Sequence, residues 1–123
     1  TVLLVEDDDS LRALTERILH RRGYVVLSAA TAAEAIRLAA THDRIDLLLT
    51  DVVMPDSSGP EIAVALRRQH PALPVVYMSG YAESILATRT ELPAGATLLH
   101  KPVSAHQLLS TIPRVMKARP VTA

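Results

Sequence analysis

The segment Asp46-Leu47-Leu48-Leu49-Thr50-Asp51 indicates the class of fold of this chain. Its body is apolar at every position from Leu47 to Leu49, and two polar residues, Thr50 and Asp51, follow at once. A short strand without polar alternation is typical of a parallel sheet, because helices cover both faces of such a sheet. The segment therefore predicts a buried strand with a carboxylate at its carboxyl end.

Similar strand-length runs occur elsewhere in the chain, and segments with helical spacing separate them. The expected strands are Val2–Val5, Tyr24–Leu27, Asp46–Leu49, Pro74–Met78 and Thr97–Leu99. The expected helices are marked by apolar residues around Leu14, Ala35, Ile62, Ile85 and Leu108. This alternation predicts an α/β domain with a five-stranded parallel sheet and helices on both faces.

Helix boundaries are indicated by a few residues. Gly23 is placed to cap the carboxyl end of the first helix, and Asp9 or Ser10 is the expected N-cap at its start. Pro113 lies inside the last helical segment, where it removes a backbone donor, so we expect a kink or an end there. We assign residues 1–119 to the domain and 120–123 to a tail. The chain starts at Thr1 without an initiator Met, and we interpret it as a piece trimmed from a longer protein.

The composition argues against several classes of function. Acidic and basic residues number 13 each, and the only aromatic residues are three tyrosines, so a nucleic-acid surface is not expected. The chain has no cysteine, which excludes thiolate chemistry and fits a cytoplasmic protein. No apolar run approaches the length of a membrane span, so direct membrane contact is not expected.

The residues after the strands carry the chemistry. In an open parallel sheet, ligands bind beyond the carboxyl ends of the strands, and these ends share one edge of the sheet. The polar residues expected at that edge are Glu6, Asp7, Asp8 and Asp9, then Thr50 and Asp51, then Ser79, and finally His100 and Lys101. Acids, a hydroxyl and an amine are therefore predicted to converge there.

Grouped carboxylates without Cys or paired His favour an oxygen-only metal site, and Mg²⁺ suits such a site. Asp51 could then serve as a third metal ligand or as a nucleophile that attacks phosphorus and forms an acyl phosphate. Lys101 and Ser79 would neutralise and hydrogen-bond the transferred oxygens. We assign Asp8 and Asp9 to the first turn of the helix, where acids favour the helix dipole.

Five motifs in order resemble the receiver domains of two-component response regulators over essentially the whole chain. They are Val5-Glu6-Asp7-Asp8, Leu49-Thr50-Asp51-Val52-Val53-Met54-Pro55, Ser57-Ser58-Gly59, Met78-Ser79-Gly80 and Lys101-Pro102. The resemblance implies the doubly wound, flavodoxin-like receiver fold with strand order 2-1-3-4-5, for which a chemotaxis receiver is a reference example. It also implies a phosphorelay module that is not an enzyme in its own right.

The same resemblance implies a role for each site residue. Asp51 would accept a phosphoryl group from the phosphohistidine of a histidine kinase or a histidine phosphotransfer protein. Glu6, Asp7, Asp51 and the backbone carbonyl of Val53 would hold Mg²⁺. Ser79 would be the switch hydroxyl and Lys101 the partner of the phosphoryl group, and the Lys101-Pro102 peptide would be cis.

One departure from the family concerns the readout of phosphorylation. The receiver family usually has an aromatic residue three positions before the lysine, and here that position is Leu98. Tyr81, two residues after Ser79, is a candidate substitute. The output, the cognate kinase and the oligomeric state are not encoded in these motifs. A stand-alone regulator and the receiver of a hybrid histidine kinase both fit.

Three alternatives are less well supported. A phosphatase of the haloacid-dehalogenase type needs a second Asp two residues after the first, and that position holds Val53. A flavodoxin-like redox protein would need a Ser/Thr/Gly-rich phosphate loop in place of Glu6-Asp7-Asp8. A pseudo-receiver scaffold usually lacks one of the site residues, and here all are present.

Overall fold

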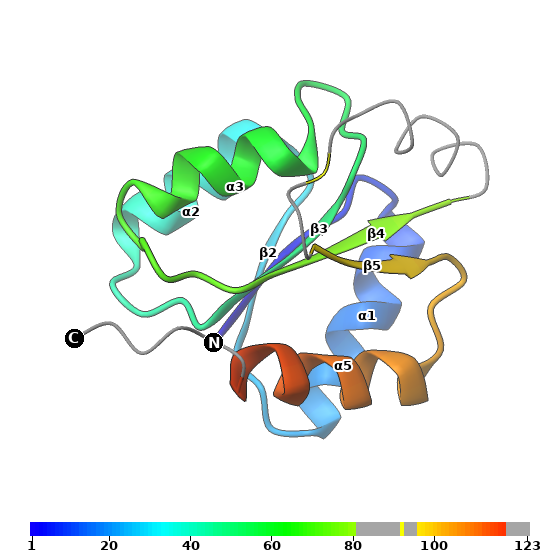
Figure 1. Cartoon of the computed structure of the whole chain (residues 1–123). Helices are drawn as coiled ribbons and strands as arrows, with labels where there is room; N and C mark the ends of the chain where they lie inside the picture. The colour runs from blue at the N-terminus through cyan, green and yellow to red at the C-terminus, as the bar shows by residue number, and fades with distance from the viewer. Residues whose placement is uncertain (81–91, 93–95, 118–123) are drawn as a thin grey trace.

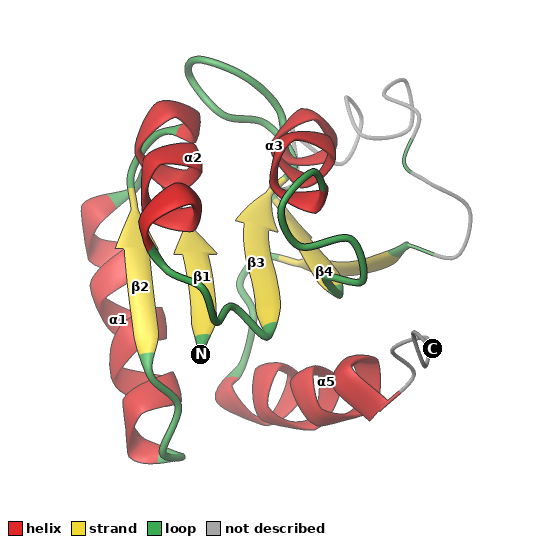
Figure 2. Ribbon diagram, turned by 90° about the vertical axis from the view of Figure 1, so that its left-hand side faces the viewer, coloured by secondary structure: helices red, strands yellow, loops and turns green. Residues whose placement is uncertain are grey.

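Strands and helices alternate in a computed structural model of the chain, which describes residues 1–80, 92 and 96–117. The elements are β1 (Val2–Val5), α1 (Asp9–Arg21), β2 (Val26–Ala29), α2 (Ala32–Thr41), β3 (Leu47–Asp51), α3 (Gly59–Arg67), β4 (Val75–Ser79), β5 (Thr97–His100) and α5 (Ala105–Lys117). The helix expected around Ile85 falls outside the described residues. The five strands form a parallel sheet in the order β2-β1-β3-β4-β5, which confirms the expected order (Figure 2).

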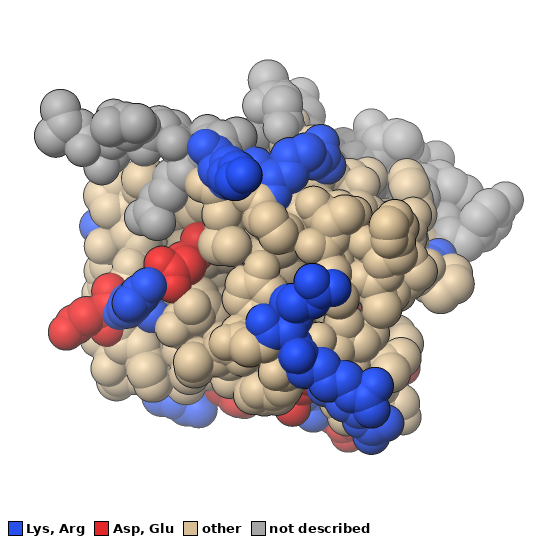
Figure 3. Space-filling view, turned by 90° about the horizontal axis from the view of Figure 1, so that it is seen from below, with Lys and Arg blue, Asp and Glu red and all other residues tan. Residues whose placement is uncertain are grey.

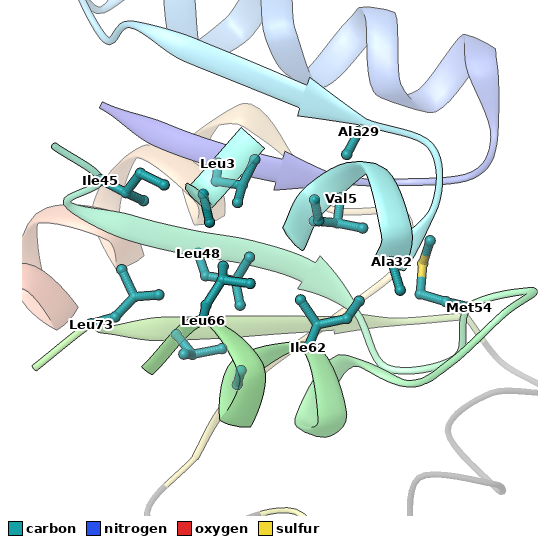
Figure 4. Close-up of a cluster of buried hydrophobic side chains, with 14 of the residues drawn as sticks. Leu3, Val5, Ala29, Ala32, Ile45, Leu48, Met54, Ile62, Leu66 and Leu73 are labelled. Carbon is teal, nitrogen blue, oxygen red and sulfur yellow. The ribbon is translucent and has the colours of Figure 1, made fainter. Parts of the chain in front are cut away.

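Helices cover both faces of this sheet, as its apolar strands require. Helices α2 and α3 lie on one face, and α1 and α5 lie on the other (Figure 1). Successive residues of a strand point to opposite faces. In β1, for example, Leu3 and Val5 belong to the α2–α3 core, whereas Val2 and Leu4 belong to the α1–α5 core. The α2–α3 core is drawn in Figure 4.

The helix starts follow from short polar side chains. The N-cap of α1 is Asp8, whose Oδ1 accepts a hydrogen bond from the amide of Leu11 at 3.0 Å, so the expected N-cap at Asp9 or Ser10 was wrong. Thr31 caps α2 and Ser58 caps α3. Gly23 follows α1 with a φ of +90°, a conformation that favours glycine, which confirms its role at the helix end.

Four of the expected strands had wrong boundaries. Strand β2 begins at Val26 rather than at Tyr24, because the amide of Tyr24 still donates to the carbonyl of Leu19 at the end of α1. Strands β3, β4 and β5 extend into their polar ends, since backbone pairing continues through Asp51, Ser79 and His100.

Helix α5 does not end at Pro113 but continues to Lys117. Pro113 itself is exposed, whereas the residue before it, Ile112, is buried against the sheet. Val115 and Met116 then pack on the same core, and this burial holds the segment helical despite the lost amide donor.

Gly59, at the start of α3, marks a close approach between this helix and the sheet. A Cβ atom built on Gly59 would lie 2.5 Å from the backbone oxygen of Asp51 and 3.0 Å from Cδ1 of Tyr77. The amide of Gly59 donates to the carbonyl of Val52 at 2.7 Å. Only a residue without a side chain fits here, and the segment between Asp51 and Gly59 is therefore drawn tightly onto the sheet edge.

Candidate functional site

Asp51 lies at the carboxyl end of the central strand β3 and is fully buried, with 0% of its surface exposed. Strands β1 and β4 flank it on either side. Its Oδ2 atom is buried and accepts no hydrogen bond from the described residues. A buried carboxylate oxygen without a partner is uncommon, because desolvation of the charge is then uncompensated.

Two further acids meet Asp51 at this edge. Glu6, directly after β1, is buried, and its neighbour Asp7 is exposed. One carboxylate oxygen from each of Glu6, Asp7 and Asp51 lies within 4.8 Å of the others. The backbone of Glu6 is fixed on both sides, since its amide donates to Ala29 and its carbonyl accepts from the Nη1 atom of Arg12 at 2.9 Å. The predicted acidic cluster is therefore assembled.

Lys101 supplies the positive charge of the site. Its Nζ atom lies 2.7 Å from Oε1 of Glu6 and 2.8 Å from Oδ1 of Asp51. The Lys101–Pro102 peptide is cis, as the resemblance implied. The amide of Lys101 donates to the carbonyl of Ser79 at 2.7 Å, which fixes the lysine backbone to the end of β4. The contact between Lys101 and Glu6 was not predicted from the sequence.

Burial and crowding change the protonation of these groups. Burial, together with the neighbouring Glu6, raises the pKa of Asp51 to about 9. Burial also opposes the charge on Glu6, but its contacts with Asp51 and Lys101 outweigh this effect and lower its pKa. For Lys101, burial is likewise outweighed by the two carboxylates, which raise its pKa. Near neutral pH, Asp51 therefore keeps its proton while Glu6 and Lys101 are charged, unless a further cation joins them.

The donor set fits a Mg²⁺ ion. All the candidate ligands are oxygen atoms, as Mg²⁺ prefers, and Asp7 opens the cluster to solvent, which leaves room for bound water. A cation beside Asp51 would give the buried Oδ2 atom a partner and would favour the ionised carboxylate.

The segment after β3, residues 52–58, is called the acceptor loop here. It carries Val53, which is half-buried and forms an antiparallel bridge with Ser58. Within the bridge, the amide of Met54 donates to the carbonyl of Ser57 at 3.2 Å. The loop is thus closed on itself beside Asp51, and the Val53 carbonyl belongs to a short, braced segment.

The remaining predicted residues are the switch hydroxyl Ser79 and the two readout candidates, Leu98 and Tyr81. Ser79 is buried at the end of β4 and pairs with His100, the residue before Lys101. Leu98 is half-buried on β5, and its neighbour in the pairing with β4 is Tyr77, whose ring is buried. Tyr81 lies outside the described residues.

One contact of the acceptor loop was missed by sequence reasoning. The sequence indicates no partner for Asp56, but its carboxylate accepts hydrogen bonds from the amides of Ala32 and Ala33 in α2. These residues are more than twenty positions apart in the sequence. Asp is common in turns, and no local sequence pattern indicates that Asp56 binds the start of α2.

One face of the molecule shows how the charged side chains are distributed. On the face drawn in Figure 3, Lys and Arg side chains form separate groups divided by uncharged residues. Among the residues that the structure covers, no helix has the length and apolar character needed to cross a bilayer.

Known proteins resemble this chain over almost its full length. The family model of the response regulator receiver domain matches residues 2–113. The sensor kinase CckA of Brucella abortus is 38% identical over 118 residues, which are 95% of this chain but 12% of the kinase. The receiver protein CpdR of the same organism is 31% identical over 117 residues, covering 95% of this chain and 97% of CpdR.

Solved structures give the same result. The receiver domain of the hybrid histidine kinase CckA superposes with a TM-score of 0.78 at 32% identity, covering 94% of this chain and 97% of that domain. A response regulator receiver protein from Sinorhizobium medicae has a TM-score of 0.83 at 28% identity, covering 97% and 95%. With its sheet order and its acidic edge, the chain belongs to the response regulator receiver domain family of two-component signalling.

Proposed function

We propose that this domain is a phosphoacceptor in which Asp51 receives a phosphoryl group in a Mg²⁺-dependent reaction. The observation that carries the proposal is the placement of Asp51, which is fully buried between an acidic pair and an ammonium group 2.8 Å away. A solvated surface acid would have neither partner. The arrangement is that of a nucleophile whose charge is controlled by its surroundings.

Each residue of the site has a task in this proposal. Once the Asp51 carboxyl has released its proton to solvent, an Oδ atom attacks phosphorus and forms an acyl phosphate as the bond from phosphorus to the donor nitrogen breaks. Glu6, Asp7, Asp51 and the Val53 carbonyl would hold Mg²⁺, which supplies positive charge to the phosphoryl oxygens when bound. Lys101 exchanges its contact with the Asp51 carboxylate for one with the phosphoryl group. Ser79 donates its hydroxyl hydrogen to a phosphoryl oxygen.

The donor is proposed to be the phosphohistidine of a histidine kinase or of a histidine phosphotransfer protein. The identity to the CckA kinase makes a hybrid kinase one setting for this domain, and the full-length match to CpdR makes a stand-alone regulator another. In both settings the domain is modified once per signal and changes its partner contacts. It is proposed to be a signalling module rather than an enzyme with turnover.

The test is to incubate the chain with a small-molecule phosphodonor, with and without Mg²⁺, and to measure its intact mass. We expect the mass of one phosphoryl group to be gained only with Mg²⁺, and to be absent in Asp51→Asn. The matched control is Asp43→Asn, an exposed acid in the loop after α2, which should be modified like the wild type.

Two results would contradict the proposal. Catalytic turnover of a phosphate ester would indicate a phosphatase. A chain that is inert toward phosphodonor and toward beryllofluoride at saturating Mg²⁺ would indicate a pseudo-receiver scaffold. No feature of the described residues favours either alternative, since Val53 occupies the position of the second phosphatase aspartate.

A further inference from the structure

The acceptor loop is attached to a helix that contributes nothing to the acidic cluster. Oδ1 of Asp56 accepts a hydrogen bond from the amide of Ala32 at 3.0 Å, and Oδ2 accepts one from the amide of Ala33 at 3.2 Å. These amides are in the first turn of α2, where backbone donors have no partner inside the helix. Both carboxylate oxygens of Asp56 thus accept hydrogen bonds at the amino end of α2.

This contact is reinforced by packing beneath it. Met54, two residues before Asp56, is buried in the α2–α3 core together with Ala32. Figure 4 shows Met54 beside Ala32 at the edge of this core. The loop therefore meets the start of α2 twice, once through an apolar side chain and once through the Asp56 carboxylate.

The loop is also held at both of its ends. Its first residue, Val52, is tied to the sheet by its amide, which donates to Met78 at 2.9 Å. Its last residue, Ser58, is the N-cap of α3. The middle of the loop is held by the contacts of Met54 and Asp56 to α2, by the packing of Val53 on the α2–α3 core, and by the Ser57 hydroxyl, which donates to Glu61 of α3 at 2.7 Å.

We propose that Asp56 is a positioning residue for the metal site, which fastens the acceptor loop to the amino end of α2 and thereby holds the Val53 carbonyl in place. The inference rests on the proposed function, because it takes that carbonyl as a Mg²⁺ ligand. Asp56 acts through the loop and is not itself a ligand. Residues that orient the ligands of a metal affect affinity even when they do not contact the ion.

A charge effect is the competing explanation, since any acid near a cation favours its binding. The two explanations make different predictions for Asp56→Asn and Asp56→Ala. Asparagine has no charge but keeps one acceptor oxygen, so it can serve one of the two amides. Alanine has neither. A positioning role places Asp56→Asn between wild type and Asp56→Ala, whereas a charge effect makes the two variants equal.

The experiment measures Mg²⁺ affinity by titration calorimetry for wild type, Asp56→Asn and Asp56→Ala. We expect Asp56→Ala to bind about tenfold more weakly, with Asp56→Asn closer to wild type. A second readout needs no metal. The amides of Ala32 and Ala33 should exchange with solvent faster in Asp56→Ala, as measured by NMR on the metal-free chain.

Thr31→Ala is the matched control. The hydroxyl of Thr31 accepts from the amide of Glu34 at 3.2 Å, so this variant weakens the same end of α2 without touching the acceptor loop. We expect it to lower thermal stability and leave Mg²⁺ affinity at the wild-type value.

Three outcomes would overturn the inference while leaving the proposed function standing. They are unchanged Mg²⁺ affinity in Asp56→Ala, equal affinities of the Asn and Ala variants, and an equal loss in Thr31→Ala. A wild-type chain that binds no Mg²⁺ would instead contradict the proposed function itself, and with it the inference. The failures are thus distinguished by whether the wild type binds.

Discussion

The ammonium group of Lys101 lies 2.8 Å from Oδ1 of Asp51, although Asp51 ends β3 and Lys101 follows β5, and these strands are not neighbours in the sheet. Strand β4 lies between them, so the long lysine side chain reaches across a strand to the central carboxylate. The same ammonium group contacts Glu6. A single ammonium group therefore contacts both buried acids. Its removal should leave both of them without this partner.

Replacing Lys101 with Met should destabilise the metal-free protein by about 3 kcal/mol, because it leaves two buried carboxyl groups without their counter-ion. The free energy of unfolding from urea titration measures the effect. Addition of Mg²⁺ should restore part of the loss. In Lys101→Arg, which keeps the charge, the loss should be smaller. A Lys101→Met chain as stable as wild type would show that the ion pairs contribute nothing.

The stability of the metal-free protein should depend on pH through Asp51. Its pKa is about 9 in the folded protein, against an ordinary value of 3.8, so the folded state keeps a proton that the unfolded chain releases between these values. The stabilising contribution of this carboxyl is therefore complete below the lower value and is lost as pH rises toward the upper one. Asp51→Asn has no such proton to lose.

We therefore expect Asp51→Asn to be more stable than wild type at about pH 8, by about 1 kcal/mol or more, with the difference shrinking toward about pH 5. Urea unfolding at several pH values without divalent cations measures it. A difference that grows as the solution is acidified would contradict the raised pKa of Asp51.

Mg²⁺ should stabilise the wild type through Asp7. A ligand at 100 times its dissociation constant raises the free energy of unfolding by about 2.7 kcal/mol. Because Asp7 is exposed, Asp7→Asn should change the metal-free stability by less than about 0.5 kcal/mol while weakening the response to Mg²⁺. Thermal unfolding over a Mg²⁺ titration measures both. An undiminished response in Asp7→Asn would remove Asp7 from the metal site.

Tyr77→Phe should stabilise the protein by about 1 kcal/mol. The hydroxyl of Tyr77 is buried and has no hydrogen-bond partner among residues 1–80, 92 and 96–117, and an unsatisfied buried hydroxyl is costly. Tyr24→Phe, at a half-buried position, is the control and should be nearly neutral. A loss of stability in Tyr77→Phe would indicate that this hydroxyl has a partner in the folded state.

Much of this architecture is predictable from local sequence. The apolar strands and the polar residues after them predict a parallel sheet with a functional edge, since both features depend on which side chains meet water. Strand ends are harder to predict. Thr50 and Asp51 belong to β3 because backbone pairing with β1 and β4 continues past the apolar run, and pairing depends on strands distant in the sequence.

The site was predictable in its members but not in its contacts. The meeting of Glu6, Asp7 and Asp51 follows from the shared edge of a parallel sheet. The contact of Lys101 with Glu6 depends on how a flexible side chain crosses the sheet, and that of Asp56 with α2 depends on how a loop folds over a helix end. Neither leaves a periodic pattern in the sequence.

Gly59 places the start of α3 directly against Asp51, the proposed phosphoacceptor. A Cβ atom on Gly59 would lie 2.5 Å from the backbone oxygen of Asp51, so the helix can begin here only because Gly59 has no side chain. A saturation mutagenesis screen for phosphorylation should therefore find position 59 as intolerant as the acidic residues. Such a screen would count a residue with no reactive group among the essential ones, because in this domain geometry alone is enough to make a position irreplaceable.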